Sequence, residues 1–132
     1  MMSFELTCVA WTLVLALLQI VVAAVAKTAQ YGPKWNMGAR DEAPGPLKPV
    51  AGRLDRAQAN LFETLPLFIG AVLVATLAGR TGNQTHWGAM IYLAGRVLYV
   101  PLYAAGIPVV RTVVFTVSCV GLVMCMTPIL LP

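Results

Sequence analysis

Long apolar stretches separated by short polar segments dominate the pattern of this chain. Leu6 to Ala26 and Thr112 to Pro132 contain no charged residue, while Ala57 to Gly79 and Trp87 to Ala105 contain one charge each. A helix that crosses the hydrocarbon core of a bilayer needs about 20 mostly apolar residues. The pattern therefore predicts four membrane-spanning helices, at about residues 4–26, 55–79, 87–104 and 108–131.

The composition supports an integral membrane protein, since 59% of the residues are hydrophobic and only 11% are charged. In soluble domains, about a quarter of the residues are usually charged. Four spans leave no room for a separate soluble domain, so residues 1–132 are predicted to form a single all-α membrane domain. The segment "VAAVA" resembles a signal-peptide cleavage site, but no Lys or Arg precedes the first apolar run. That run also exceeds the ~7–15 apolar residues of a signal peptide, which favours a retained helix.

The basic residues predict how the helices are oriented. Six of the nine lie between Lys27 and Arg56, in or next to the loop at about residues 27–54. By the positive-inside rule this loop is cytoplasmic, and both termini lie on the opposite side. Because these charges gather in one loop and do not cover a folded surface, they do not indicate a nucleic-acid partner.

Residues that often carry catalysis or bind metals are scarce. The cysteines Cys8, Cys119 and Cys125 lie in apolar segments, at spacings that suit neither a disulfide framework nor a metal site. His86, the single histidine, lies in a polar connection with no neighbour in sequence to orient it as a catalytic base. No metal site is expected.

Polar residues share one face of the second predicted helix. Arg56, Asn60 and Glu63 are spaced i, i+4 and i+7. A charge inside the membrane costs at least ~2.5–3.5 kcal/mol, so these side chains should face the interior of the bundle.

The third and fourth predicted helices continue this pattern. Arg96, Tyr99 and Tyr103 form one stripe, and Arg111 lies in the first turn of the last helix. All these residues belong to the cytoplasmic half, so the sequence predicts a polar pocket that faces the cytoplasm. Three arginines against one carboxylate, Glu63, favour an anionic ligand. In the alternative, Glu63 pairs with an arginine, and the network only fixes helix register.

The stretch "RAQANLFETLPLF" resembles the helix-two signature of the membrane-associated proteins in eicosanoid and glutathione metabolism, the MAPEG family. Its Arg, Asn, Glu and Pro positions correspond to Arg56, Asn60, Glu63 and Pro66. A second match, "GRVLYVPLYAAGIPVVRTVVF", contains Tyr99, Tyr103 and Arg111. With the four-span layout, the resemblance covers essentially the whole chain and is that of a bacterial-type member.

The resemblance implies a homotrimer of four-helix protomers that binds glutathione between neighbouring subunits, near the cytoplasmic side. It implies that Arg111 stabilises the glutathione thiolate. The expected glutathione-binding residues are Arg56, Asn60, Glu63, Arg96, Tyr99, Tyr103 and Lys27, the last standing where family enzymes usually have Arg. The chain departs from the prostaglandin E synthase branch at Ala59, Tyr99, Thr112 and Phe115.

The leading hypothesis is a glutathione-dependent transferase or peroxidase, in a bacterial inner membrane or a similar one. Its substrates would be lipophilic electrophiles that partition from the bilayer, and membrane lipids would surround it. The alternative is a non-catalytic lipid-binding or scaffolding trimer, because one branch of the family binds lipids without catalysis. A small multidrug exporter is disfavoured, since such proteins need a carboxylate in the middle of helix one and Glu5 lies at its edge.

Overall fold

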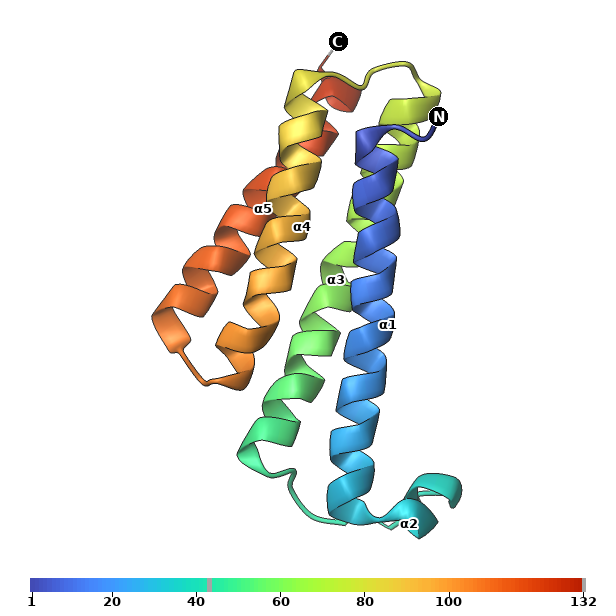
Figure 1. Cartoon of the computed structure of the whole chain (residues 1–132), viewed down its shortest axis with the longest axis vertical. Helices are drawn as coiled ribbons and strands as arrows, with labels where there is room; N and C mark the ends of the chain where they lie inside the picture. Colours follow the sequence, from blue (N-terminus) through green and yellow to red (C-terminus); the bar gives the residue numbers. More distant parts are fainter. Residues whose placement is uncertain (43, 132) are drawn as a thin grey trace.

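The computed structural model describes residues 1–42 and 44–131, and every regular element in them is a helix. The helices are α1 (Phe4–Tyr31), α2 (Pro33–Met37), α3 (Pro49–Leu77), α4 (Asn83–Ala104) and α5 (Pro108–Leu130). The four long helices form one bundle, and the short α2 lies at the end of α1 (Figure 1). The prediction of an all-α bundle is confirmed.

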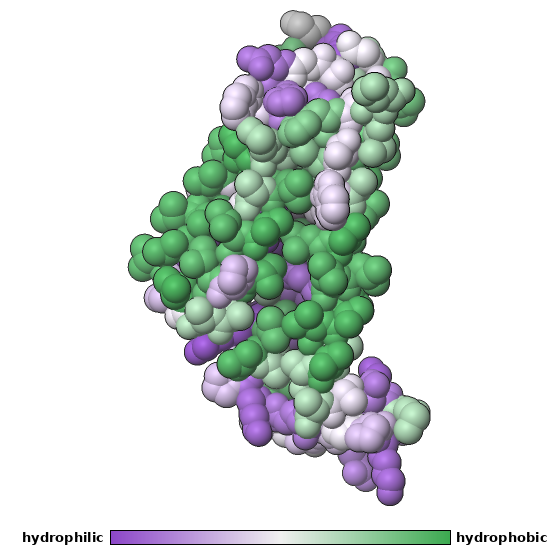
Figure 2. Space-filling model, viewed as in Figure 1, coloured by the Kyte–Doolittle hydropathy of each residue, from purple (hydrophilic) through white to green (hydrophobic). Residues whose placement is uncertain are grey.

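Three of the helices, α1, α3 and α5, are long and apolar enough to cross a membrane. Figure 2 shows a broad hydrophobic band around the middle of the molecule, with hydrophilic residues gathered toward its two ends. Helix α4 is less apolar because it carries polar side chains that the bundle buries, among them Thr85, Tyr92 and Arg96. The span predicted at about 87–104 thus corresponds to α4. The composition of α4 alone does not identify this helix as a membrane span.

The helix ends next to the first loop differ from the sequence prediction. Helix α1 continues past Ala26 to Tyr31, and α3 already begins at Pro49, so both helices extend into the predicted loop at about 27–54. The predicted boundaries followed the end of the apolar runs, but a helix needs no apolar side chains to continue beyond a bilayer. Proline at the first helical position suits such a start, since its missing N–H would have no partner there.

Helices α4 and α5 approach each other very closely at two glycines. A Cβ atom added to Gly121 would lie 2.6 Å from the Gly88 carbonyl oxygen and 2.7 Å from the Tyr92 backbone nitrogen. The Tyr92 ring stacks on Phe68 of α3 at 4.0 Å, and its hydroxyl lies 2.8 Å from the Thr64 hydroxyl. These contacts fix the rotation of α4, so that Arg96, one turn further on, is buried against α3.

Candidate functional site

The polar face of α3 begins two turns into that helix. Arg56, Asn60 and Glu63 lie on successive turns; Arg56 and Glu63 are exposed and Asn60 is half-buried. The spacing that predicted a shared face also orders the residues along the helix axis, at about 1.5 Å per residue. The face therefore offers a cation, an amide and an anion over roughly 10 Å.

Arg96 connects α3 with α4. Its Nη1 donates a hydrogen bond to Asn60 Oδ1 at 2.8 Å, and the whole residue is only 1% exposed. Its guanidinium carbon lies 4.8 Å from the ring centroid of Tyr99 and 5.7 Å from that of Phe115. Two aromatic faces and one amide thus hold a cation at a depth where water is scarce.

The hydrogen-bonding capacity of Arg96 is only partly used. Its Nε and Nη2 have no hydrogen-bond partner among the described residues. A buried guanidinium with free donors is unfavourable, and each donor favours the binding of an acceptor oxygen. Both nitrogens are covered by protein atoms, so an acceptor reaches them only when a neighbouring side chain moves.

Tyr103, near the end of α4, joins the arginines of α3 and α5. Arg56 Nε donates to the Tyr103 hydroxyl oxygen at 3.0 Å, and the Arg111 guanidinium carbon lies 4.4 Å from the Tyr103 ring centroid. The rings of Tyr99 and Tyr103 pack edge to face at 5.4 Å. Six of the predicted site residues therefore form one continuous cluster, which we call the arginine–tyrosine cluster: Arg56, Asn60, Arg96, Tyr99, Tyr103 and Arg111.

Glu63 does not pair with an arginine. Within residues 1–42 and 44–131 no hydrogen bond or ion pair involves its carboxylate, and the ion pair found there joins Lys27 to Asp55. The register-fixing alternative required Glu63 to bond Arg56 or Arg96, and neither contact is present. The carboxylate is instead exposed on the flank of the protomer.

Lys27, like Glu63, is a predicted site residue that the structure does not bring into the cluster. It lies near the end of α1, where its ammonium group pairs with the Asp55 carboxylate of α3. Both side chains are about one-third exposed, at 32% and 39%. Asp55 and Arg56 are adjacent along α3 and so point in directions about 100° apart. The Lys27–Asp55 pair therefore ties α1 to α3 beside the cluster.

The structure also reveals neighbours of the cluster that the sequence interpretation missed. Arg53 Nη1 donates to the Ala104 carbonyl oxygen at 3.3 Å and covers the turn between α4 and α5. A side chain at Gly106, whose φ is +77°, would collide with this guanidinium at 2.7 Å. The available signal was the position of Arg53, one turn before Arg56 on nearly the same face. Phe115, the second aromatic face over Arg96, gave no signal beyond its position one turn after Arg111.

The comparison with protein-family models matches the MAPEG family over residues 8–131. The chain belongs to the MAPEG family. Members of this family are glutathione-related membrane proteins, so the three long apolar helices belong to an integral multi-pass membrane protein. The expected family membership is thereby confirmed. No curated protein matches the chain significantly.

Proposed function

We propose that this MAPEG protein is a glutathione-dependent transferase or peroxidase that acts on lipophilic electrophiles. The observation that carries the proposal is the convergence of Arg56, Arg96 and Arg111 on two tyrosines and one amide. Among the residues that the structure describes, no carboxylate is bonded to any of the three arginines. A cationic cluster inside an apolar bundle favours an anionic ligand, since desolvated charges otherwise remain uncompensated.

The chemistry of glutathione matches this arrangement group by group. Its two carboxylates suit Arg56 and Arg96, which can form charge-assisted bonds with them. Its ammonium group suits Glu63, whose carboxylate forms no ion pair within residues 1–42 and 44–131. Its thiol suits Arg111, because the cation and the start of α5 both favour a thiolate.

The proposed reaction begins with the thiolate of bound glutathione, which is the nucleophile. In conjugation the sulfur forms a bond to an electrophilic carbon, the leaving group departs with its electron pair, and the thiol proton passes to solvent. In peroxide reduction two glutathione thiols are oxidised to a disulfide, while the peroxide is reduced to an alcohol and water. Arg111 contributes to both by keeping the sulfur ionised.

A homotrimer completes the proposed site. Arg56 and Glu63 are exposed on the single protomer, at positions that the apolar runs place inside the membrane. Charged side chains at that depth face a bundle interior or a polar cavity, not lipid. A neighbouring subunit would cover this face and enclose glutathione between the two chains.

We also propose that α4 is the fourth span, with the first loop and the cluster toward the cytoplasm and both termini outside. Helix α4 runs beside the three apolar helices (Figure 1), and Thr85, Tyr92 and Arg96 of this helix are buried. The membrane in question would be a bacterial inner membrane or a similar one. The concentration of Lys and Arg in and next to the first loop supports this orientation.

One observation favours the non-catalytic alternative, a lipid-binding or scaffolding trimer. Arg56, Asn60, Arg96 and Tyr103 already bond to one another in pairs, as a purely structural network would. The two functions differ in how Asn60→Ala behaves. A glutathione pocket predicts a folded protein with weakened glutathione affinity, whereas a structural network predicts lower thermal stability with or without glutathione.

Thermal unfolding in detergent tests the proposal. A ligand present at 100 times its Kd stabilises the folded state by about 2.7 kcal/mol. We expect millimolar glutathione to raise the Tm of the native protein and to raise that of Asn60→Ala less. No glutathione-dependent shift in the native protein would reject the enzyme and favour the scaffold.

A further inference from the structure

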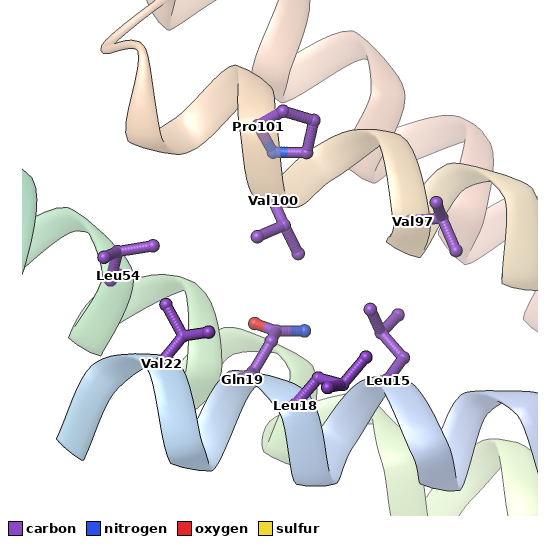
Figure 3. A pocket seen from close by; sticks show the side chains of 8 residues that line it. All are labelled: Leu15, Leu18, Gln19, Val22, Leu54, Val97, Val100 and Pro101. Atoms are coloured by element: carbon purple, nitrogen blue, oxygen red, sulfur yellow. The ribbon is translucent and has the colours of Figure 1, made fainter. Parts of the chain in front are cut away.

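A cavity of about 360 Å³ lies between α1, α3 and α4, apart from the arginine–tyrosine cluster. Figure 3 shows its lining, in which α1 forms one wall and α4 the opposite wall. The lining residues are Leu15, Leu18, Gln19, Val22, Leu54, Val97, Val100 and Pro101. All but Gln19 are apolar.

Gln19 is the feature that distinguishes this cavity from an ordinary packing gap. Its side chain extends from α1 into the cavity toward Val100 (Figure 3), and the residue is only 6% exposed. Its Oε1 is buried and has no hydrogen-bond partner among the described residues. An unpaired buried amide costs about 1–3 kcal/mol, so it favours any occupant that supplies the missing bond.

The opposite wall lacks one of the hydrogen-bond donors of a regular α-helix. Pro101 has no N–H, so the Val97 carbonyl lacks the donor that an α-helix normally supplies four residues later. Val97 and Pro101 both line the cavity. The Gln19 amide on α1 thus faces an apolar wall on α4 that offers it no side-chain hydrogen-bond partner.

The mouth of the cavity faces the hydrocarbon region. Leu18, Val22 and Val97 line it and expose 56%, 44% and 48% of their surface. All three belong to the apolar stretches that are predicted to cross the membrane. An occupant would therefore enter sideways from the bilayer and would itself be lipophilic.

We propose that this cavity binds a neutral lipophilic alcohol, with its hydroxyl on Gln19 and its alkyl chain along α1 and α4. A hydroxyl both donates and accepts, so it satisfies the Gln19 amide in either orientation of its oxygen and nitrogen. A charged head group is excluded, because the cavity has no ion to pair with it. The proposal goes beyond the proposed glutathione chemistry and does not depend on it.

The size of the cavity limits the occupant. At roughly 30 Å³ for each water-sized group, 360 Å³ accommodates about a dozen groups, which is a medium-length alkyl chain with one hydroxyl.

Photolabelling of the full chain in phosphatidylcholine vesicles, without glutathione, tests the proposal. The probe is dodecanol with a photoreactive diazirine in the middle of its chain, and labelled residues are identified by mass spectrometry. We expect labels on cavity residues such as Leu15 and Val97. Unlabelled dodecanol should compete about fivefold better than dodecane, the preference that one hydrogen bond provides.

Three variants separate the hydroxyl contact from general packing. Gln19→Leu should keep labelling in the cavity but abolish the preference for dodecanol over dodecane. Val100→Trp should fill the cavity and prevent labelling there. Thr12→Val is the matched control, since Thr12 is also buried and polar on α1 but bonds the Cys8 carbonyl oxygen and does not line the cavity. It should behave like the native protein.

Several results would overturn the proposal. Equal competition by dodecanol and dodecane in the native protein would show that Gln19 binds no hydroxyl. Equal loss of the preference in Thr12→Val would assign the effect to helix packing. Labelling spread over exposed residues such as Trp11 would show lipid contact only. Cross-links between α1 of one copy and α4 of another, with no probe in the cavity, would show that a second copy covers it.

Discussion

Each polar residue of the arginine–tyrosine cluster has a distinguishable contact. The Tyr103 hydroxyl accepts from Arg56, while the Tyr103 ring faces Arg111. Arg96 instead depends on Asn60 and on the rings of Tyr99 and Phe115 for its contacts. Single substitutions can therefore remove one function of a side chain and keep the other.

Tyr103→Phe removes the acceptor of Arg56 and keeps the ring beside Arg111. We expect glutathione affinity to fall by up to about tenfold, because Arg56 loses the bond that orients it. Thiolate formation at saturating glutathione should persist. Tyr31→Phe is the control, since the Tyr31 hydroxyl donates to Gly45 in the first loop, away from the cluster. Calorimetric titration measures both affinities, and an equal loss in the two variants would contradict this assignment.

Lys27→Ala tests whether the pair with Asp55 belongs to the site. The pair is partly exposed and lies beside the cluster, so the free energy of unfolding should change by less than about 1 kcal/mol. Glutathione affinity should stay within about twofold of the native value, since about 0.4 kcal/mol corresponds to that factor. A large loss of affinity in the same titration would place Lys27 in the binding site after all.

At the scale of the helices, the contact of α4 with α5 depends on two glycines. A Cβ at Gly121 would lie 2.6 Å from the Gly88 carbonyl oxygen, so Gly121→Ala must separate the helices. We expect it to lower the free energy of unfolding by about 1–3 kcal/mol. Gly70→Ala is the matched control: it lies within α3 with no atom within 4 Å of the added Cβ, and should be neutral or slightly stabilising. Thermal unfolding in detergent compares them, and equal Tm values would contradict the close packing.

The helices themselves could be predicted from the apolar runs, and the shared face of Arg56 and Asn60 from their spacing. Two things could not. The end of α1 beyond Ala26 was missed because a helix continues into water without an apolar signal. The partners of Lys27 and Arg53 were missed because they depend on how α1, α3 and α4 are rotated against each other. Side-chain spacing within one helix does not determine that rotation.

At the scale of the whole molecule, topology and assembly determine whether the cluster can reach glutathione. We propose that the first loop lies in the cytoplasm, with both termini outside. Single cysteines introduced at exposed positions between α1 and α3, such as Asn36 of α2, should react with an impermeant thiol reagent only after the membrane is opened. Reaction in intact cells would reverse the orientation. These single cysteines would be introduced into a variant in which Cys8, Cys119 and Cys125 have been replaced.

The proposed trimer gives a second expectation for the whole molecule. Because Arg56 and Glu63 lie exposed on one flank, cysteines placed near them should cross-link between subunits to give species up to three chains. A cysteine at exposed Trp11, on α1 instead of α3, serves as a comparison position. Cross-linking that stops at two chains would contradict the trimer.

The central claim is that Arg111 ionises the thiol of bound glutathione, and anaerobic titration with ultraviolet detection of thiolate tests it most directly. Each unit by which the thiol pKa falls corresponds to about 1.4 kcal/mol of preference for the thiolate. The native protein should develop thiolate absorbance as glutathione binds. Arg111→Ala should still bind glutathione but develop no such absorbance, and Arg111→Lys should recover part of it. Full thiolate absorbance in Arg111→Ala, or none in the native protein at saturating glutathione, would contradict the account.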